Sequence, residues 1–319
     1  DRMLDILLFW AGKGIDAFRC DMAEMVPVEF WQWAIGKVKE AHPDILFIAE
    51  VYNPAQYRDY VHRGGFDYLY DKVGLYDALR AVTRHEASAQ CLTRCWQQVD
   101  DIRTHMLNFL ENHDEQRLAS DFFAGDARRG RAPLLVSALM DYCPMMIYFG
   151  QELGERGMDA EGYSGRDGRT TIYDYWTVDT VSRWRNGGKF NDKKLTGDEK
   201  RLREFYARVL ALRESMPVLR SGHFYDLMYV NRHLHRQYVF VRQLEKQVLL
   251  VIANFDDQEA NLSIHLPEEF FRFIGQKGQT EVRALDLLSE EETQVDFTPD
   301  RPLCAKVLPW NGLVLSIDL

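Results

Sequence analysis

FLENHD, residues 109–114, is an apolar strand end that gives way to polar side chains. Two similar strand ends lie upstream, RCD at residues 19–21 and IAE at residues 48–50. Each apolar run closes on a carboxylate. In a barrel of parallel strands the carboxyl ends lie at one face, so three acids in these positions would converge on a single site. Paired carboxylates commonly cleave sugar bonds, so the pattern predicts an enzyme that acts on glycosidic bonds.

Outside these strand ends, the spacing of apolar residues predicts alternating strands and helices. Strands are expected over residues 15–21, 45–51, 66–69, 105–110 and 145–149, and helical spacing over residues 3–11, 28–40, 54–62, 76–82, 91–102, 132–140 and 202–210. This alternation indicates parallel β/α construction, and catalytic side chains at strand ends suit a barrel. Trp10 and Trp31 lie on helical patterns and are assigned to core packing.

The spacing of apolar residues changes at about residue 219. Short β-type runs over residues 238–241, 248–253, 262–266, 282–287 and 313–317 are separated by Gly, Asn, Asp and Pro. This pattern predicts an antiparallel β-sandwich domain over residues 219–319, after a β/α catalytic domain over residues 1–218. The segment from about 151 to 197 is the one long irregular stretch, and loops of that length are usually functional or disordered.

The composition excludes several classes of protein. The chain of 319 residues is 46% hydrophobic and carries a net charge of −10, which suits a globular protein with a sizeable core. The negative charge argues against nucleic acid or an anionic membrane as partner, because both require a positive patch. No apolar run reaches the roughly 18 residues of a membrane span, and residues 1–5 lack the layout of a signal peptide. The compartment stays open between cytoplasm and periplasm.

Five widely spaced cysteines do not suggest a disulfide framework. Cys20 alternates out of phase with Arg19 and Asp21 and is expected in the core. Cys91 and Cys95 lie at i and i+4 without a second Cys or His pair nearby. Packed thiols are therefore favoured over a zinc site, and no metal ligands are assigned.

The first carboxylate, Asp21, ends a strand on which Ala17, Arg19 and Asp21 share one face, because side chains alternate along a strand. Arg19 is expected to keep Asp21 ionised, since an opposite charge nearby lowers the pKa of a carboxyl group. An ionised Asp can serve as a nucleophile. The alternative is an ion pair that merely closes the top of the barrel.

The second carboxylate, Glu50, follows the apolar run over residues 45–49, so partial burial is expected to raise the pKa of its carboxyl group. A protonated Glu50 could donate its proton to a leaving oxygen while Asp21 stays charged. A retaining glycosidase requires one protonated and one ionised carboxyl group, with the two groups about 5 Å apart. The alternative is a Glu that only caps a strand end.

The third carboxylate, Asp114, follows Asn112 and His113 directly after an apolar strand. His113 can donate to sugar hydroxyls, and Asp114 can bind them while favouring positive charge at the reacting carbon. A structural role for His113 is the alternative. Arg117 could hold Asp114 in place or be a simple surface charge.

Three segments together resemble conserved regions of the α-amylase family, glycoside hydrolase family 13. They are GIDAFRCD at residues 14–21, the run that ends at residue 50, and FLENHD at residues 109–114, and their order and spacing also match. The resemblance implies three catalytic carboxylates, with Asp21 as nucleophile, Glu50 as general acid and base, and Asp114 as the residue that stabilises the distorted sugar. It implies substrate contacts at Arg19 and His113, and we group Asn112 and Arg117 with them.

Two departures from the family pattern matter. Many α-amylases carry a Lys-His pair three and four residues after the nucleophile, where this chain has Glu24 and Met25. The family's first region, an Asp with an Asn-His pair on an earlier strand, has no counterpart before Asp21. By analogy the chain corresponds to strands 4 to 8 of a (β/α)8 TIM barrel plus the C-terminal domain of a longer enzyme, for which Ca²⁺ is the cofactor left open. Exposed barrel edges would then favour self-association or pairing with the missing half.

The sequence thus predicts a retaining hydrolase of α-linked glucans, such as starch or maltooligosaccharides, which forms a covalent glycosyl ester on Asp21. A glucan transferase or isomerase of the same family is the first alternative, because a sugar acceptor can replace water in the same chemistry. A truncated, non-catalytic carbohydrate-binding fragment is the second alternative.

Overall fold

The computed structural model describes residues 1–159, 166–172 and 177–318. Its contacts divide the chain into two compact units. Unit 1 comprises Asp1–Asp77, Cys95–Phe109 and Cys143–Met145, and unit 2 comprises Ala78–Arg94, Leu110–Tyr142 and Met146–Leu319. Unit 1 holds most of a parallel sheet, and unit 2 holds the antiparallel strands.

The sheet of unit 1 is built from short strands that pair in parallel, in chain order. They are β1 (Ala17–Cys20), β2 (Leu46–Ala49), β3 (Tyr68–Tyr70) and β4 (Met106–Phe109), and β5 (Met145–Met146) completes the five-stranded order. Arg19 lies opposite Ile48 in the register of β1 and β2. The backbone N–H of Glu50 also donates to the carbonyl of Cys20 at 3.1 Å. The ends of β1 and β2 therefore lie side by side.

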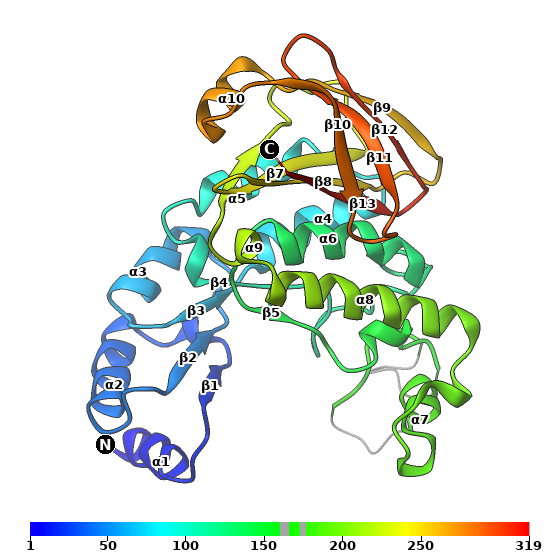
Figure 1. Cartoon of the computed structure of the whole chain (residues 1–319). Helices are drawn as coiled ribbons and strands as arrows, with labels where there is room; N and C mark the ends of the chain where they lie inside the picture. The colour runs from blue at the N-terminus through cyan, green and yellow to red at the C-terminus, as the bar shows by residue number, and fades with distance from the viewer. Residues whose placement is uncertain (160–165, 173–176, 319) are drawn as a thin grey trace. The chain divides into compact units, whose positions relative to one another are not determined.

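Three helices belong to the same unit, α1 (Arg2–Ala11), α2 (Val28–Ala41) and α3 (Tyr57–His62). Figure 1 shows α2 and α3 beside the strands, and α2 packs against both other helices. The buried face of α2 follows helical spacing through Trp31, Ile35 and Val38. Trp31 is 8% exposed and packs edge-on against Phe66, with 5.0 Å between ring centroids. Its assignment to the core is confirmed.

Trp10 does not follow the prediction. Helix α1 packs against the core of unit 1 through Leu4, Leu7 and Leu8, whereas Trp10 has 51% of its surface exposed. The assignment of Trp10 to core packing is therefore wrong, because only one face of this helix is covered and helical spacing does not say which one. Cys20 is buried as predicted, and burial raises the pKa of its thiol to about 12.

One helix of unit 2 is buried at every position after its first residue. This helix is α6 (Arg131–Leu139); α8 (Gly197–Ser215) packs beside it, and α9 (Pro217–Ser221) packs against α8 and β7. Thr196 and Glu199 form a capping box that starts α8, and Pro217 opens α9. The described residues include three further helices that lie wholly or partly in this unit, α4 (Asp77–Thr83), α5 (Cys91–Gln98) and α7 (Asp179–Arg185).

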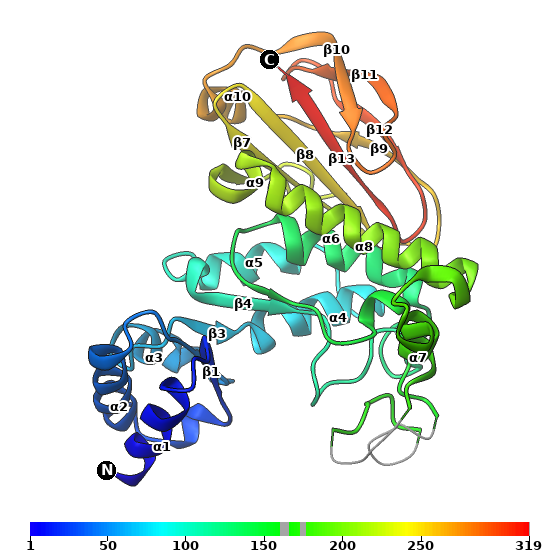
Figure 2. The same cartoon turned by 60° about the horizontal axis from the view of Figure 1, so that its bottom comes forward.

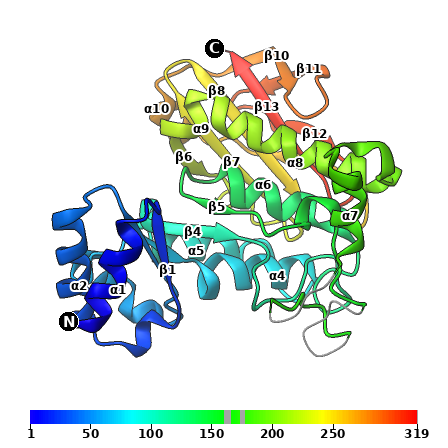
Figure 3. The same ribbon diagram turned by 90° about the horizontal axis from the view of Figure 1, so that it is seen from below.

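The antiparallel strands of unit 2 begin at His223. A six-stranded sheet has the order β11-β10-β13-β8-β7-β6, and β9 pairs with β12. Their bounds are β6 (His223–Asp226), β7 (Gln237–Leu244), β8 (Gln247–Asn254), β9 (Ala260–Ile264), β10 (Gln279–Asp286), β11 (Glu292–Phe297), β12 (Leu303–Val307) and β13 (Gly312–Asp318), with the helix α10 (Glu268–Ile274) between β9 and β10. Figures 2 and 3 show α8 and α9 lying along β7, β8 and β13, and α6 packs directly on β8 and β13.

A buried arginine fixes the helices of unit 2 to this sheet. Arg242 on β7 is 3% exposed, and its guanidinium donates to the carbonyls of Leu139 and Met140 at the end of α6. It also donates to the carbonyls of Leu219 and Gly222 at the end of α9. These carbonyls have no partner within their own helices, so one side chain satisfies the ends of two helices at once.

Gly312 lies where β13 passes close to the α6 side chain Leu135. A Cβ at this position would lie 2.3 Å from Leu135 Cδ1 and 2.3 Å from the carbonyl oxygen of Ile252. We expect Gly312→Ala to destabilise the protein by about 1–3 kcal/mol, because neither the strand nor the helix can move without disturbing its packing. Urea unfolding followed by circular dichroism measures the change.

Gly36 provides the matched control for Gly312. It is exposed on α2, and a Cβ there meets nothing within 4 Å. Gly36→Ala should therefore leave the free energy of unfolding unchanged or raise it by up to about 1 kcal/mol, since Ala favours the helix. Equal stability of the two variants would show that α6 does not pack on Gly312 in solution.

The predicted fold class is confirmed. Five parallel strands of half-barrel type come first in the chain, and the antiparallel sheets of a β-sandwich follow. The division into domains at residue 218 stays a prediction. In the part of the chain that the structure describes, no helix combines the length and the apolar character that crossing a bilayer requires.

Candidate active site

Two of the predicted catalytic carboxylates share one guanidinium group in unit 1. Arg19, on β1, pairs with Asp21 through Nη1 and with Glu50 through Nη2, the latter at 2.9 Å from Oε1. Asp21 follows β1 directly, and Glu50 follows β2 directly. The parallel register of the two strands therefore brings Glu50 beside Arg19 and Asp21, about 30 residues earlier in the sequence.

The two carboxylates differ sharply in exposure. The side chain of Asp21 is 72% exposed, whereas that of Glu50 is 5% exposed. Glu50 accepts hydrogen bonds from the backbone N–H of Met22 at Oε2 and from the hydroxyl of Tyr52 at Oε1, both at 2.8 Å. Asp21 is thus open to an incoming group, and Glu50 is enclosed and held at both oxygens.

The guanidinium of Arg19 stays positively charged between these two carboxylates. Burial alone would lower the pKa of its guanidinium, but hydrogen bonds to Asp21 and Tyr70 and the charge of Glu50 raise it well above its ordinary value. The Arg19 guanidinium also lies 5.4 Å from the ring centroid of Tyr70. A permanent cation between two carboxylates offsets their mutual repulsion and lets both stay close together.

Sequence reasoning missed two residues beside Glu50. Tyr52 contacts its carboxylate directly. Glu24 accepts hydrogen bonds at Oε2 from the backbone N–H groups of Tyr52 and Asn53, at 3.0 and 2.9 Å. One feature of the sequence indicates that the segment after Asp21 is unusual. Glu24 and Met25 stand where the family has a Lys-His pair.

The remaining predicted site residues lie in unit 2. Asn112 is 1% exposed, and its Oδ1 accepts from the backbone N–H groups of Asp114 and Glu115 at 2.9 and 2.8 Å. The Nε2 atom of His113 lies 3.1 Å from Oδ2 of Asp114. Asn112 thus shapes the turn that presents Asp114, whose side chain is 50% exposed. Because Asp21 and Glu50 belong to unit 1, a common site with Asp114 stays a prediction.

Arg117 is neither the surface charge nor the substrate contact that was expected of it. Its side chain is 0% exposed, so it is not a surface charge and offers no atom to a substrate. Nη1 pairs with Glu111 at 2.8 Å and Nε donates to the Thr170 hydroxyl at 2.9 Å, while the guanidinium lies 4.1 Å from the ring centroid of Tyr148. The expected substrate contact is replaced by a buried ion pair that supports the loop after residue 110.

Glu111 is the acidic partner in that pair and is 1% exposed. Complete burial raises the pKa of its carboxyl group, an effect that the Arg117 charge opposes. Its Oε1 also accepts from the backbone N–H of Leu118 at 2.8 Å. Glu111 is the carboxylate of FLENHD that faces inward, which leaves Asp114 as the exposed one.

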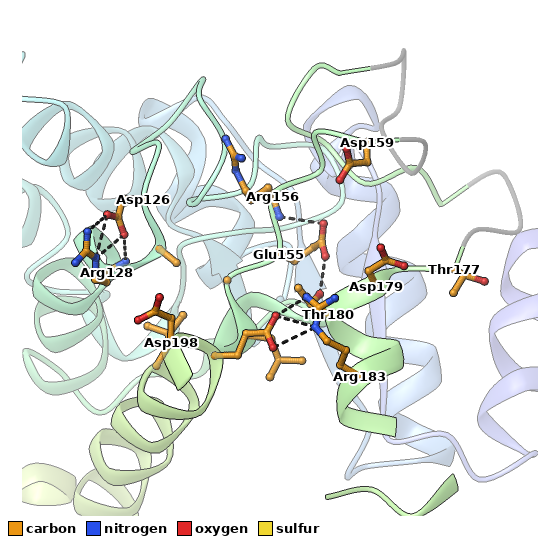
Figure 4. Close-up of a pocket in the computed structure, with 15 residues that line it drawn as sticks. Asp126, Arg128, Glu155, Arg156, Asp159, Thr177, Asp179, Thr180, Arg183 and Asp198 are labelled. Atoms are coloured by element: carbon orange, nitrogen blue, oxygen red, sulfur yellow. Dashed lines mark hydrogen bonds and ion pairs between the residues drawn. The ribbon is translucent and has the colours of Figure 1, made fainter. Parts of the chain in front are cut away.

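A cavity of about 690 Å³ also lies in unit 2. None of the seven predicted site residues is among its lining residues. Figure 4 shows polar side chains around it that bond to one another, Asp126 with Arg128 and Glu155 with Thr180. Arg183 in its wall pairs with Glu199. Part of its wall comes from the irregular segment over residues 151–197 that the sequence singled out.

Among the residues that the structure describes, no group of three or more His, Cys, Asp or Glu side chains is arranged to hold a metal ion. A role for Ca²⁺ in a longer protein stays a prediction, as does self-association through sheet edges.

Comparison with known proteins gives consistent matches. The family model described as alpha amylase, catalytic domain, matches residues 1–222. An alpha-1,4-glucan:maltose-1-phosphate maltosyltransferase of Cereibacter sphaeroides is 34% identical over 89 residues, which cover 26% of this chain and 15% of that protein. Neopullulanase 2 of Thermoactinomyces vulgaris is 25% identical over 323 residues, which cover 97% of this chain and 48% of that protein.

Solved structures show the same fold. An α-amylase of Geobacillus thermoleovorans, complexed with acarbose, superimposes with a TM-score of 0.72 at 19% identity. The match covers 99% of this chain and 63% of that one. The chain thus spans about half the length, or less, of the curated relatives that it matches.

Proposed function

This chain belongs to the α-amylase family, glycoside hydrolase family 13, and on that premise we propose that the protein is a retaining hydrolase of α-linked glucans. One observation carries the proposal. An exposed carboxylate, Asp21, and an enclosed one, Glu50, hold the same guanidinium at the ends of neighbouring parallel strands. Starch-derived maltooligosaccharides are the proposed substrates, and the acarbose in a structure of similar fold supports this class.

In the proposed first step, Asp21 attacks the anomeric carbon and forms a glycosyl ester, while the bond to the leaving oxygen breaks. The proton of Glu50 moves to that oxygen. The exposure of Asp21 supports its role, because a nucleophile must be reached by the sugar. Arg19 supports it as well, since its guanidinium pairs with the Asp21 carboxylate and orients it.

In the proposed second step, the carboxylate of Glu50 takes a proton from water, and the oxygen of that water attacks the anomeric carbon. The ester bond to Asp21 breaks, and the sugar leaves with its original configuration. Glu50 regains its proton, so the cycle closes. We propose that Asp114, with His113 beside it, binds hydroxyls of the distorted sugar in both steps.

A glucan transferase is the second candidate, because curated relatives carry the name maltosyltransferase. In that case a sugar hydroxyl replaces water in the second step, and the roles of Asp21 and Glu50 stay the same. Chromatography of products from one maltooligosaccharide of defined length separates the two candidates.

Only shorter chains, released at first as the α-anomer by NMR, would support hydrolysis with retention. Longer chains would support transfer instead. An unchanged substrate, in the protein expressed from its complete gene, would favour a non-catalytic carbohydrate-binding protein. A β-anomer as first product would contradict the role of Asp21 as nucleophile.

A further inference from the structure

The contacts of Glu50 raise a chemical question. In the proposed function its carboxyl group is protonated before the first step and ionised before the second, so its neighbours must tolerate both states. The Met22 N–H and the Arg19 guanidinium can only donate hydrogen bonds. The hydroxyl of Tyr52 can donate or accept. Among the contacts described above, Tyr52 is therefore the one that suits both forms of Glu50.

Tyr52 is held in place from two further sides. Glu24 accepts from the backbone N–H groups of Tyr52 and Asn53 with a single oxygen, Oε2. The ammonium group of Lys72 lies 5.9 Å from the Tyr52 ring centroid and pairs with Asp77 at 2.9 Å. The backbone, the ring and the hydroxyl of Tyr52 thus each have a defined contact, which fixes the hydroxyl against Glu50.

We propose that Tyr52, fixed by Glu24, is a positioning residue whose hydroxyl reverses its hydrogen bond to Glu50 as that carboxyl group gains and loses the catalytic proton. This inference rests on the proposed function. When Glu50 is protonated and no sugar is bound, its O–H can donate to the Tyr52 oxygen, and on substrate binding it turns to the leaving oxygen. When the proton has moved to the leaving oxygen, the Tyr52 O–H turns and donates to the carboxylate. Tyr52 keeps its own proton throughout.

The role of Glu24 is specific to chains with an acceptor at this position. A Lys, which many α-amylases carry there, has three donors and no acceptor and could not bind the same two N–H groups. The departure from the family pattern therefore has a structural consequence in this chain. It ties the segment after β1 to the segment after β2, and so places Tyr52 beside Glu50.

Tyr52→Phe tests the proposal in the protein expressed from its complete gene. We expect kcat on a maltooligosaccharide to fall about 10- to 100-fold, as for loss of a hydrogen bond to a charged group, with KM nearly unchanged. With maltosyl fluoride as substrate, kcat should fall less than about threefold, because the fluoride leaving group needs little help from an acid. This comparison applies when formation of the glycosyl ester is the rate-limiting step. A merely structural defect would affect both substrates alike.

Tyr60→Phe is the matched control. It removes a hydroxyl that donates to the carbonyl of Val26 at 2.8 Å in the same unit, a main-chain acceptor and not a carboxylate. We expect its kcat on both substrates to stay within about twofold of the unsubstituted protein. Melting temperatures of both variants show whether unit 1 stays folded.

Substitutions of Glu24 test the position of the Tyr52 hydroxyl independently. They decide whether Tyr52 positions Glu50 even if Tyr52→Phe does not fold. Glu24→Gln keeps one oxygen that can accept both N–H groups and should retain near-normal kcat. Glu24→Ala should reproduce the selective loss on maltooligosaccharides. Combining Glu24→Ala with Tyr52→Phe should cost little more than Tyr52→Phe alone, because both act through one contact.

The outcomes separate this inference from the proposed function. If Glu50→Gln is inactive but Tyr52→Phe behaves like Tyr60→Phe, the positioning role is wrong and the proposed function stands. Equal losses on the two substrates would also overturn the positioning role. If Glu50→Gln keeps normal turnover, the proposed function fails, and this inference fails with it.

Discussion

Asp21→Asn should lower kcat/KM for maltooligosaccharides by about 10⁴-fold or more, because an amide cannot form the glycosyl ester of the proposed reaction. The substitution keeps the shape of the side chain and one oxygen that can accept from Arg19. The fold of unit 1 should therefore not change. Steady-state kinetics on the protein expressed from its complete gene measures the loss, and circular dichroism measures the melting temperature.

Asp16→Asn is the control for this prediction. Asp16 lies one residue before β1 and is exposed, so the same chemical change there should leave kcat/KM within about twofold. If Asp21→Asn kept more than about 10% of the activity, the nucleophile would have to be another residue. A loss of activity together with a large fall in melting temperature would instead mark Asp21 as a structural partner of Arg19.

The pairing of Asp21 with Glu50 illustrates what a sequence pattern can predict. Alternation along a strand placed Arg19 and Asp21 on one face, and the apolar run before Glu50 implied that it would be enclosed. Both expectations depend on short-range geometry and on hydrophobic burial. The contact of Arg19 with Asp21 agrees with the first expectation, and the 5% exposure of Glu50 agrees with the second. The catalytic roles themselves stay predictions.

Arg117 and Tyr52 illustrate what the pattern could not predict. Arg117 is four residues after His113, yet its guanidinium turns toward Glu111 and Thr170. Tyr52 follows Glu50 by two residues, and its position depends on Glu24, which belongs to another strand end. Both outcomes rest on contacts between segments distant in sequence, and no local period encodes such contacts.

The strands that the sequence missed share a physical feature. β6 and β11 form the two edges of the six-stranded sheet, and β12 belongs to the two-stranded sheet. β11 has only two buried positions, Val295 and Phe297, and its other side chains are polar. An edge strand is half exposed and often charged, so its hydrophobic alternation is weak. The central strands β7 and β8 are buried along most of their length and were predicted.

Glu50→Gln should lower kcat on maltooligosaccharides by about 10²- to 10⁴-fold while KM changes little, because an amide can neither give nor take the catalytic proton. Gln keeps one oxygen, which can accept from Tyr52 or Met22, so the site should remain assembled. Glu40→Gln, an exposed change at the end of α2, is the control and should leave kcat within about twofold.

Maltosyl fluoride gives Glu50→Gln a readout that loss of folding cannot mimic. Its leaving group departs with little acid assistance, so the first step can proceed, whereas the second step still lacks the base that activates water. The glycosyl ester on Asp21 should therefore accumulate, and mass spectrometry of the intact protein should detect one added maltosyl group. The double variant with Asp21→Asn should show no addition. Near-normal turnover of maltooligosaccharides by Glu50→Gln would remove Glu50 from the role of acid and base.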